Sequence, residues 1–247
     1  MNHTFKRRII QFIAAAALLP ISSLGQSSAP GKDWSADLSV YLIGPRMDGN
    51  TTVSGITAEV DVPFSKIWEN LNAAGMGRAT VRYKRWGLST DVVFMGLSAD
   101  KISNRGGVDV SFDQWILQPV LEFEAASWIS PYAGARYVDL TAGIRGPLAR
   151  FDERSQTWWD PVVGAEIRIP ATAKVRLRLR GDIGGFGAGS SFSGQLEPML
   201  DWRVAKRMSL QLGYRLYYCD YETGTGRDLF RYDITTQGLQ MGATFHF

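Results

Sequence analysis

Apolar and polar residues alternate along most of this chain, and no other feature constrains its fold as strongly. In KVRLRLR, residues 174–180, basic side chains occupy every even position and aliphatic side chains occupy every odd position. The same period recurs in WSADLSVYL, GRATVRYKRW, WGLSTDVVF, FSGQLEPMLDWRV and SLQLGYRLYY. Successive side chains of a β-strand point to opposite faces, so this period predicts strands with one apolar and one polar face.

The connections between these segments are of two kinds. Short ones occur at YKRWG, EAASW, PATAK and VAKRM, and longer ones at SADKISNRGG, TAGIRGPLARFDERSQ, GGFGAGSS and YETGTGRDL. Short turns at one end of a sheet and long loops at the other are typical of β-barrels of bacterial outer membranes. The pattern predicts an all-β chain folded as a transmembrane, antiparallel up-and-down β-barrel, with the short turns at its periplasmic end.

The number of strands follows from the pattern and from parity. We expect strands near 34–43, 74–85, 86–98, 108–124, 128–140, 157–169, 174–186, 191–204, 208–221 and 229–247. Bacterial barrels made of one chain have an even number of strands, so about ten strands are expected, with eight as the alternative. The segment 50–72 is interpreted as a long first extracellular loop. Within it, PFSKIWENL predicts a short helix with Ser65 as its N-cap, which could fold into the mouth as a plug.

The N-terminal residues have the three parts of a secretory signal peptide. A basic start at 6–8 precedes the apolar run IIQFIAAAALL, and small residues precede a cut at Gln26. We therefore expect residues 1–25 to be a signal peptide and residues 26–247 to form a single domain. A membrane anchor is the alternative, but the run is shorter than the ~20 residues that a spanning helix needs. No uninterrupted apolar run of ~18 residues follows, which leaves a soluble exported protein or a barrel.

The end of the chain, QGLQMGATFHF, resembles the C-terminal assembly signal of Gram-negative outer-membrane proteins. Its apolar face consists of Leu239, Met241, Ala243, Phe245 and Phe247. The mature chain as a whole resembles small outer-membrane β-barrel proteins, the class that includes the outer-membrane protein A transmembrane domain and the opacity-type porins, in segments such as WDPVVGAEI and LGYRLYY. This resemblance implies the barrel fold, a location in the cell outer membrane, contact with outer-membrane lipid and recognition by the barrel assembly machinery. It implies no activity.

Aromatic residues are expected to form two girdles at the membrane interfaces. The periplasmic girdle would contain Trp34, Trp86, Trp128, Trp202 and Phe247, and the other girdle Phe94, Phe112, Tyr137, Trp159, Tyr218 and Phe230.

Charged residues within the strands fall on the polar face. In a membrane barrel this face must line the lumen, since an arginine that faces lipid at the midplane costs ~2–4 kcal/mol. The predicted lumen-lining residues are Arg78, Arg82, Asp91, Glu122, Arg136, Glu166, Arg168, Arg176, Arg178, Arg180, Asp182, Glu197, Asp201, Arg203 and Arg215. Buried charges need partners. A network of ion pairs in a closed interior is therefore favoured over a narrow pore whose arginines select anions.

The sequence offers little for catalysis, metal binding or cofactor binding. Histidine occurs only as His3, in the signal segment, and His246, and no serine lies close to His246 in the sequence. Resemblance to the known barrel enzymes (lipid A deacylases and palmitoyltransferases, phospholipases and omptin proteases) would require a histidine with a suitably placed Ser or Asp. Cys219 is the only cysteine, so no intrachain disulfide can form. GGFGAGSS lacks the Gly-Lys-Ser/Thr of a phosphate-binding loop. We predict no catalytic site, no metal site and no cofactor.

The predicted function is that of a non-enzymatic integral outer-membrane barrel, either structural or narrow and porin-like, with an arginine-rich lumen. A small anionic solute is a possible partner in the porin-like case. The alternative is a surface adhesion or recognition protein, with TAGIRGPLARFDERSQTW as the best candidate binding loop. A barrel enzyme that acts on lipid ranks third. Nucleic acid is not expected as a partner, because the basic residues share their face with acidic ones and the net charge is only +3.

Overall fold

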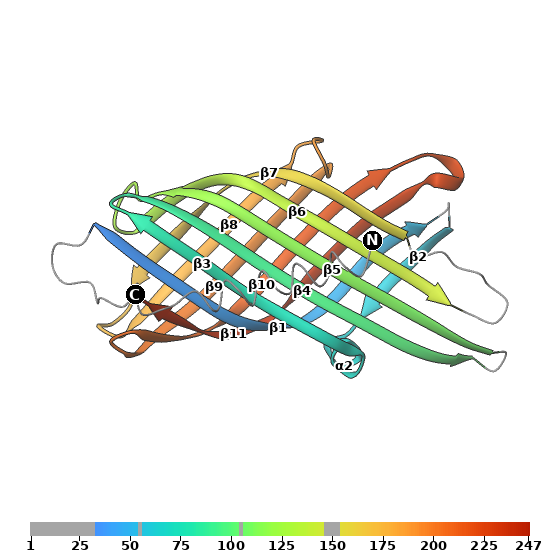
Figure 1. Cartoon of the computed structure of the whole chain (residues 1–247), viewed down its shortest axis with the longest axis horizontal. Helices are drawn as coiled ribbons and strands as arrows, with labels where there is room; N and C mark the ends of the chain where they lie inside the picture. The colour runs from blue at the N-terminus through green and yellow to red at the C-terminus, as the bar shows by residue number, and fades with distance from the viewer. Residues whose placement is uncertain (1–32, 54–55, 104–105, 146–153) are drawn as a thin grey trace.

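The computed structural model describes residues 33–53, 56–103, 106–145 and 154–247 (Figure 1). The expected signal peptide lies outside these residues. The strands are β1 (Trp34–Val53), β2 (Ile56–Val62), β3 (Leu71–Tyr83), β4 (Trp86–Ser103), β5 (Gly106–Phe123), β6 (Ile129–Arg145), β7 (Arg154–Pro170), β8 (Val175–Gly185), β9 (Phe192–Ala205), β10 (Met208–Thr223) and β11 (Phe230–His246). One short helix, α2 (Phe64–Glu69), separates β2 from β3, and a 3-10 turn, η2 (Gly226–Asp228), precedes β11.

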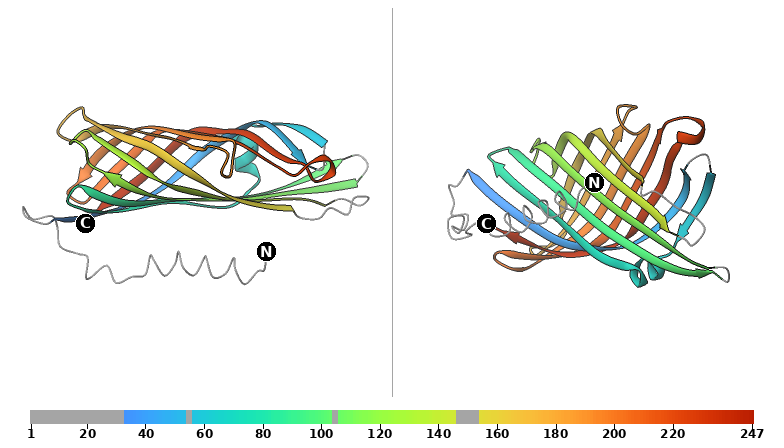
Figure 2. Two further views of the ribbon diagram at one scale, coloured as in Figure 1. Left: turned by 90° about the horizontal axis from the view of Figure 1, so that it is seen from above. Right: turned by 45° about the vertical axis from the view of Figure 1, so that its right-hand side comes forward.

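The sheet closes on itself. From β3 to β11 each strand pairs with the next one along the chain, and β11 also pairs with β1 through an antiparallel register that opposes Asp37 to His246. The strands run obliquely around the wall in both views of Figure 2, as closure of a barrel requires. The prediction of an antiparallel up-and-down barrel is confirmed. Nine of the ten expected strands match observed ones to within a few residues at each end.

The first hairpin corrects the expectation of a long loop at 50–72. β1 continues to Val53; its first half pairs with β3, over 34–40, and its second half pairs with β2, over 47–53. β2 and β3 therefore occupy one place in the wall, interrupted by α2. Counted in this way the barrel has ten strand positions, so the even number holds although eleven strand segments are present. The parity argument excluded an additional full strand but not a divided one.

The helix is present, but its start and its place differ from the prediction. Pro63 occupies the N-cap position, and Ser65 lies in the first turn. The Phe64 ring packs against Gly44, where a Cβ would lie 3.0 Å from the ring. Gly44 is on the outer face of β1, and Trp68 is 62% exposed, whereas Ile67 is buried in the interior. The helix therefore forms part of the wall and does not plug the mouth.

The outer surface of the barrel is apolar. Leu177, Leu179, Leu212, Leu239 and Met241 are all exposed on it, as the alternation predicts. Ring pairs flank this band. Trp34–Tyr83 and Trp86–Phe123 lie at the short-turn end, with centroids 4.6 and 4.8 Å apart, and Phe94–Trp115 and Tyr137–Trp159 lie farther along the strands, at 4.3 and 5.0 Å. Two predicted girdle residues are exceptions, because Phe230 is buried inside the barrel and Phe112 packs against the interior cluster.

None of the helices among the described residues is long and apolar enough to cross a bilayer.

The outward position of Leu179, halfway along β8, leads to a first prediction. Leu179→Arg should lower the free energy of unfolding by ~2–4 kcal/mol, because it places a charge in lipid near the midplane. The measurement is urea unfolding in lipid vesicles, followed by tryptophan fluorescence. Val204→Arg, on the same outer surface one residue before β9 ends, is the matched control and should cost at most ~1 kcal/mol. Equal losses for the two variants would contradict the assignment of the lipid-facing band.

Candidate functional site

The interior of the barrel has three layers. An apolar layer fills the half that is distant from the short turns, a layer of buried ion pairs crosses the middle, and a polar vestibule opens at the short-turn end. In outer-membrane barrels the short turns face the periplasm, so the vestibule is on the periplasmic side.

The apolar layer contains side chains from most of the wall. Trp158 stacks on Tyr221 with ring centroids 4.0 Å apart and an interplanar angle of 10°. The buried members are Tyr41, Met47, Ile67, Met76, Val93, Met95, Ile116, Val138, Leu140, Trp158, Tyr217, Cys219, Tyr221, Phe230, Tyr232 and Ile234. A cavity of about 30 Å³ lies among them, which is room for about one water molecule.

The first ionic cluster joins two arginines to two carboxylates. Arg78 donates to both oxygens of Glu197 at 3.0 Å and lies 3.3 Å from Asp91. Arg215 lies 3.0 Å from Asp91 and 3.4 Å from Glu197. The Tyr41 hydroxyl donates to Asp91 at 2.5 Å. These residues come from β1, β3, β4, β9 and β10, so the cluster ties opposite walls together across the lumen.

A second cluster surrounds Arg180, which lies 2.8 Å from Glu122 and 3.3 Å from Glu166. Arg178 pairs with Asp201 at 3.2 Å and with Glu166 at 3.7 Å. Arg168 also pairs with Glu166, at 2.7 Å. Glu166 therefore contacts all three arginines, and together with Glu122 and Asp201 it balances their charge.

A third cluster is built on Arg136, which is completely buried. It pairs with Asp182 and donates to Gln118 Oε1 and to Ser193 Oγ. Tyr132 and Gln118 donate to Asp182 as well. Every hydrogen-bonding atom of the Arg136 guanidinium thus has a partner, as a buried charge requires.

The basic strip of β8 divides between these layers. Arg180 is buried and Arg178 is half-buried, and both are paired. Arg176 is exposed at the rim, as is Arg203 on β9. Within the part of the chain that the structure describes, neither Arg176 nor Arg203 lies within 4.0 Å of a carboxylate. Arg82 is half-buried and links the middle layer to the rim, through Glu122 at 3.4 Å and Asp37 at 2.7 Å.

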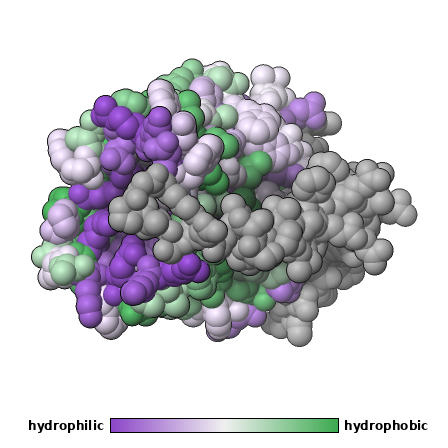
Figure 3. All heavy atoms as spheres, turned by 60° about the vertical axis from the view of Figure 1, so that its left-hand side comes forward, coloured by the Kyte–Doolittle hydropathy of each residue, from purple (hydrophilic) through white to green (hydrophobic). Residues whose placement is uncertain are grey.

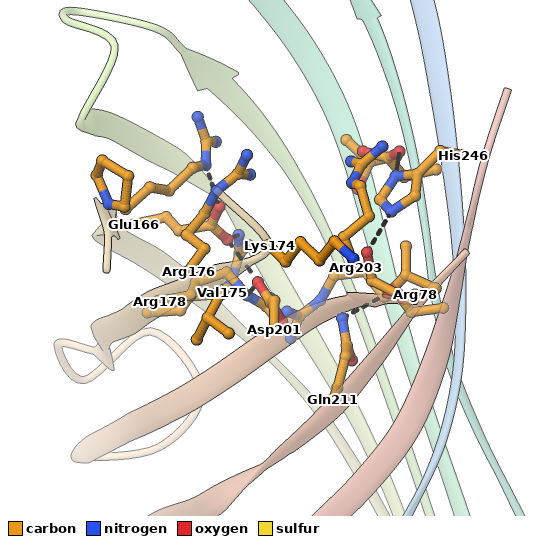
Figure 4. A pocket seen from close by; sticks show the side chains of 18 of the residues that line it. Arg78, Glu166, Lys174, Val175, Arg176, Arg178, Asp201, Arg203, Gln211 and His246 are labelled. Carbon is orange, nitrogen blue, oxygen red and sulfur yellow. Dashed lines mark hydrogen bonds and ion pairs between the residues drawn. The ribbon is translucent and has the colours of Figure 1, made fainter. Parts of the chain in front are cut away.

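The vestibule is a cavity of about 490 Å³ lined by eight cationic and five anionic side chains. Hydrophilic residues gather at this end of the molecule in Figure 3. Arg176, Arg203 and His246 reach into the same cavity in Figure 4. Across the described ranges, no group of three or more His, Cys, Asp or Glu residues is arranged to hold a metal ion. The arrangement suits a small anion.

The rim also contains a contact that the sequence analysis missed. Ser209 Oγ lies 2.9 Å from His246 Nε2, and His246 Nδ1 lies 2.7 Å from Asp37 Oδ1. The argument that His246 has no nearby serine was correct along the sequence but wrong in space. Counting residues around the β10–β11 hairpin would have found the pair, because Ser209 opposes Thr244, two positions from His246.

The C-terminal apolar face points outward. Leu239, Met241 and Phe245 are exposed on the barrel surface. A role for this face in assembly stays a prediction.

No protein-family model and no curated protein matches the chain. Among solved structures, the chain is similar to the outer membrane protease OmpT of Escherichia coli, with a TM-score of 0.50 and 7% identity over 90% of this chain and 99% of that one. It is also similar to Ail, the attachment invasion locus protein of Yersinia pestis, with a TM-score of 0.42 and 11% identity over 88% and 100% of the chains. At these identities the likeness concerns the fold alone. The closed ten-position barrel and its apolar outer band are those of an integral outer-membrane β-barrel protein.

The middle layer leads to a second prediction. Asp91→Asn should lower the free energy of unfolding by ~3–5 kcal/mol, because it leaves Arg78 and Arg215 with one carboxylate between them in a buried setting. Asp61→Asn, which breaks the exposed Arg46–Asp61 pair, should cost less than ~1 kcal/mol. Urea unfolding in lipid vesicles measures both values, and a small loss for Asp91→Asn would show that the network contributes little to stability.

Proposed function

We propose that this protein is a closed outer-membrane barrel that conducts no steady ion current and whose vestibule binds small anions on the periplasmic side. The observation that carries the proposal is that ion pairs and apolar side chains occupy the lumen beyond the vestibule, among the residues that the structure describes. Buried ion pairs and the stacked Trp158–Tyr221 layer lie in series along it. The structural variant of the predicted function is therefore favoured over the porin-like one.

The argument against a pore is energetic. A hydrated ion would have to separate pairs such as Arg78–Glu197, in which both side chains are buried. It would then have to cross an apolar layer whose cavity holds about one water molecule. Separating a buried pair costs ~3–5 kcal/mol, and several such pairs lie along the path.

The argument for anion binding is that arginines are paired with carboxylates in the middle of the lumen but not at its rim. The middle-layer arginines are neutralised by carboxylates, whereas Arg176 and Arg203 at the rim have no carboxylate partner among the described residues. In addition, three buried guanidinium atoms of residues that line the vestibule have no hydrogen-bond partner, namely Nη2 of Arg168 and the Nε atoms of Arg78 and Arg180. Guanidinium groups bind carboxylate and phosphate oxygens in a bidentate geometry. A phosphate or carboxylate ligand would supply the acceptors that this end of the lumen lacks.

The predicted lumen-lining residues take two roles in this proposal. Arg78, Asp91, Glu122, Arg136, Glu166, Arg180, Asp182, Glu197 and Arg215 close the lumen. Arg82, Arg168, Arg176, Arg178, Asp201 and Arg203 line the vestibule, whose inner end is formed by Arg78, Glu122, Glu166 and Arg180 of the first group. The adhesion alternative depends on the loop at 141–158, of which residues 146–153 lie outside the described residues, and it stays a prediction.

Planar-bilayer recording tests the closed lumen. The wild-type protein, shown to be folded by its heat-modifiable gel mobility, should give no steady conductance, because no continuous water path crosses the two inner layers. Arg178→Glu, in the vestibule, should not change this result. A steady anion-selective current that this substitution alters would restore the porin-like reading.

Titration calorimetry with inorganic triphosphate tests the vestibule. Arg176→Glu and Arg203→Glu should each weaken binding at least about tenfold, since a charge reversal next to a polyanion changes the interaction by on the order of 1–2 kcal/mol. Binding should also weaken as the salt concentration rises. Arg231→Glu, an exposed arginine at the opposite end of the barrel, is the charge-matched control. Equal binding by all four proteins would refute the vestibule as the anion site.

A further inference from the structure

Three side chains with the chemistry of a serine hydrolase meet at the vestibule rim. Ser209 is the second residue of β10, His246 is the last residue of β11 and Asp37 lies near the start of β1. These strands are neighbours in the closed sheet, in the order β10–β11–β1. Asp37 directly opposes His246, and Ser209 lies one diagonal step away. Closure of the barrel thus brings together residues that are 209 positions apart in the sequence.

The hydrogen bonds fix the role of each ring nitrogen of His246. The Asp37 carboxylate can only accept, so Nδ1 carries the proton and donates to it at 2.7 Å. Nε2 of the neutral ring is then an acceptor, and the Ser209 hydroxyl donates to it at 2.9 Å. In this tautomer the unprotonated Nε2 faces the Ser209 hydroxyl and can accept its proton, as nucleophilic catalysis requires.

Arg82 completes the row. Its Nη1 donates to the second carboxylate oxygen of Asp37 at 2.7 Å, so both oxygens are held and the carboxylate cannot rotate away from the imidazole. The Asp37 and His246 side chains keep 27% and 25% of their surface exposed. Ser209 is 5% exposed and lines the vestibule. All three side chains line the vestibule.

A neighbouring serine, Ser39, lacks the histidine contact that Ser209 has. Ser39 also lines the vestibule and is bonded to a hydroxyl, Thr244 Oγ1, at 2.8 Å. Among the described residues, no histidine or carboxylate is hydrogen-bonded to Ser39. Ser39 is therefore a matched control for Ser209, since it lies in the same layer and has the same side chain but no imidazole partner.

We propose that Ser209, His246 and Asp37 form a hydrolytic site for carboxylic esters that carry a nearby negative charge. The hydrolysis itself does not depend on the proposed anion binding, but the preference for an anionic ester rests on it. Arg203 supplies the charge, because it opposes Ser209 in the β9–β10 register and has no carboxylate partner among the described residues.

The chemistry balances with water as the co-reactant. Ser209 Oγ attacks the acyl carbon while His246 Nε2 takes the hydroxyl proton. The bond from the acyl carbon to the alcohol oxygen breaks, and His246 returns the proton to the departing alcohol. Water, deprotonated by the same nitrogen, then cleaves the acyl-serine, releasing the carboxylic acid and restoring Ser209. Asp37 acts as a positioning residue that stabilises the imidazolium in both steps.

The first experiment uses a neutral fluorophosphonate probe on the refolded full-length barrel in detergent, with heat-modifiable mobility as the check that each variant is folded. Peptide mass spectrometry should find the adduct on Ser209. Ser209→Ala should abolish labelling, and Ser39→Ala should leave it unchanged. Asp37→Asn should slow labelling by at least about a hundredfold, toward the ~10⁴-fold loss known for an orienting carboxylate. Folded wild-type protein that remains unlabelled at Ser209 would overturn the proposal.

The second experiment separates hydrolysis from anion preference. The substrates are the p-nitrophenyl ester of succinate, which keeps one free carboxylate, and the same ester with that carboxylate methylated. The wild type should hydrolyse the anionic ester at least about tenfold faster in kcat/KM. Arg203→Glu should remove this preference by raising KM for the anionic ester more than KM for the methylated one. Equal rates for both esters with normal labelling would overturn the substrate class, and hydrolysis that Ser209→Ala does not reduce would overturn the site.

Discussion

The pairing of β11 with β1 is the constraint on which the rest of the structure depends. Inside a membrane no water satisfies a backbone amide or carbonyl, so a sheet that crosses it must have no free edge. The register of seventeen residue pairs between the first and last strands removes that edge. Closure also assigns the two faces of every strand, because the apolar face meets lipid and the polar face has only the lumen left to it.

This confinement explains the ionic interior. Polar faces from ten strand positions meet within one narrow lumen, and the charges survive there because nearly all are paired. The pairs join strands that are distant in sequence as well as neighbours. Arg180 pairs with Glu166, which it opposes in the β7–β8 register, but its other partner is Glu122 of β5 and not Glu197, which it opposes on β9. Glu197 instead pairs with Arg78 and Arg215. These ion pairs therefore fill the middle of the lumen, between the apolar layer and the vestibule.

Fewer arginines are paired with carboxylates toward the short turns, and this difference determines the chemistry of the rim. Arg136 in the interior has a full set of partners, whereas Arg176 at the rim has no carboxylate beside it among the described residues. The same end of the barrel holds the Ser209–His246–Asp37 row, which Arg82 connects to the buried network through Glu122. A stable interior and an accessible, positively charged rim are therefore two parts of one hydrogen-bonded system.

The sequence by itself determined the strands, their faces and the closed barrel, because the period of two is a local property and lipid permits only one reading of it. It also determined which charges turn inward along strands such as β8. Only the tertiary structure decided which charges meet, since partners such as Arg78 and Glu197 lie 119 residues apart and depend on how far each strand is shifted around the barrel. For the same reason, no serine lies near His246 along the sequence, and it is the pairing of β10 with β11 that places Ser209 beside it. The sequence pattern did not predict that one strand position is divided into β2 and β3. Both segments pair with β1, so together they add only one strand to the count and the number of positions stays even.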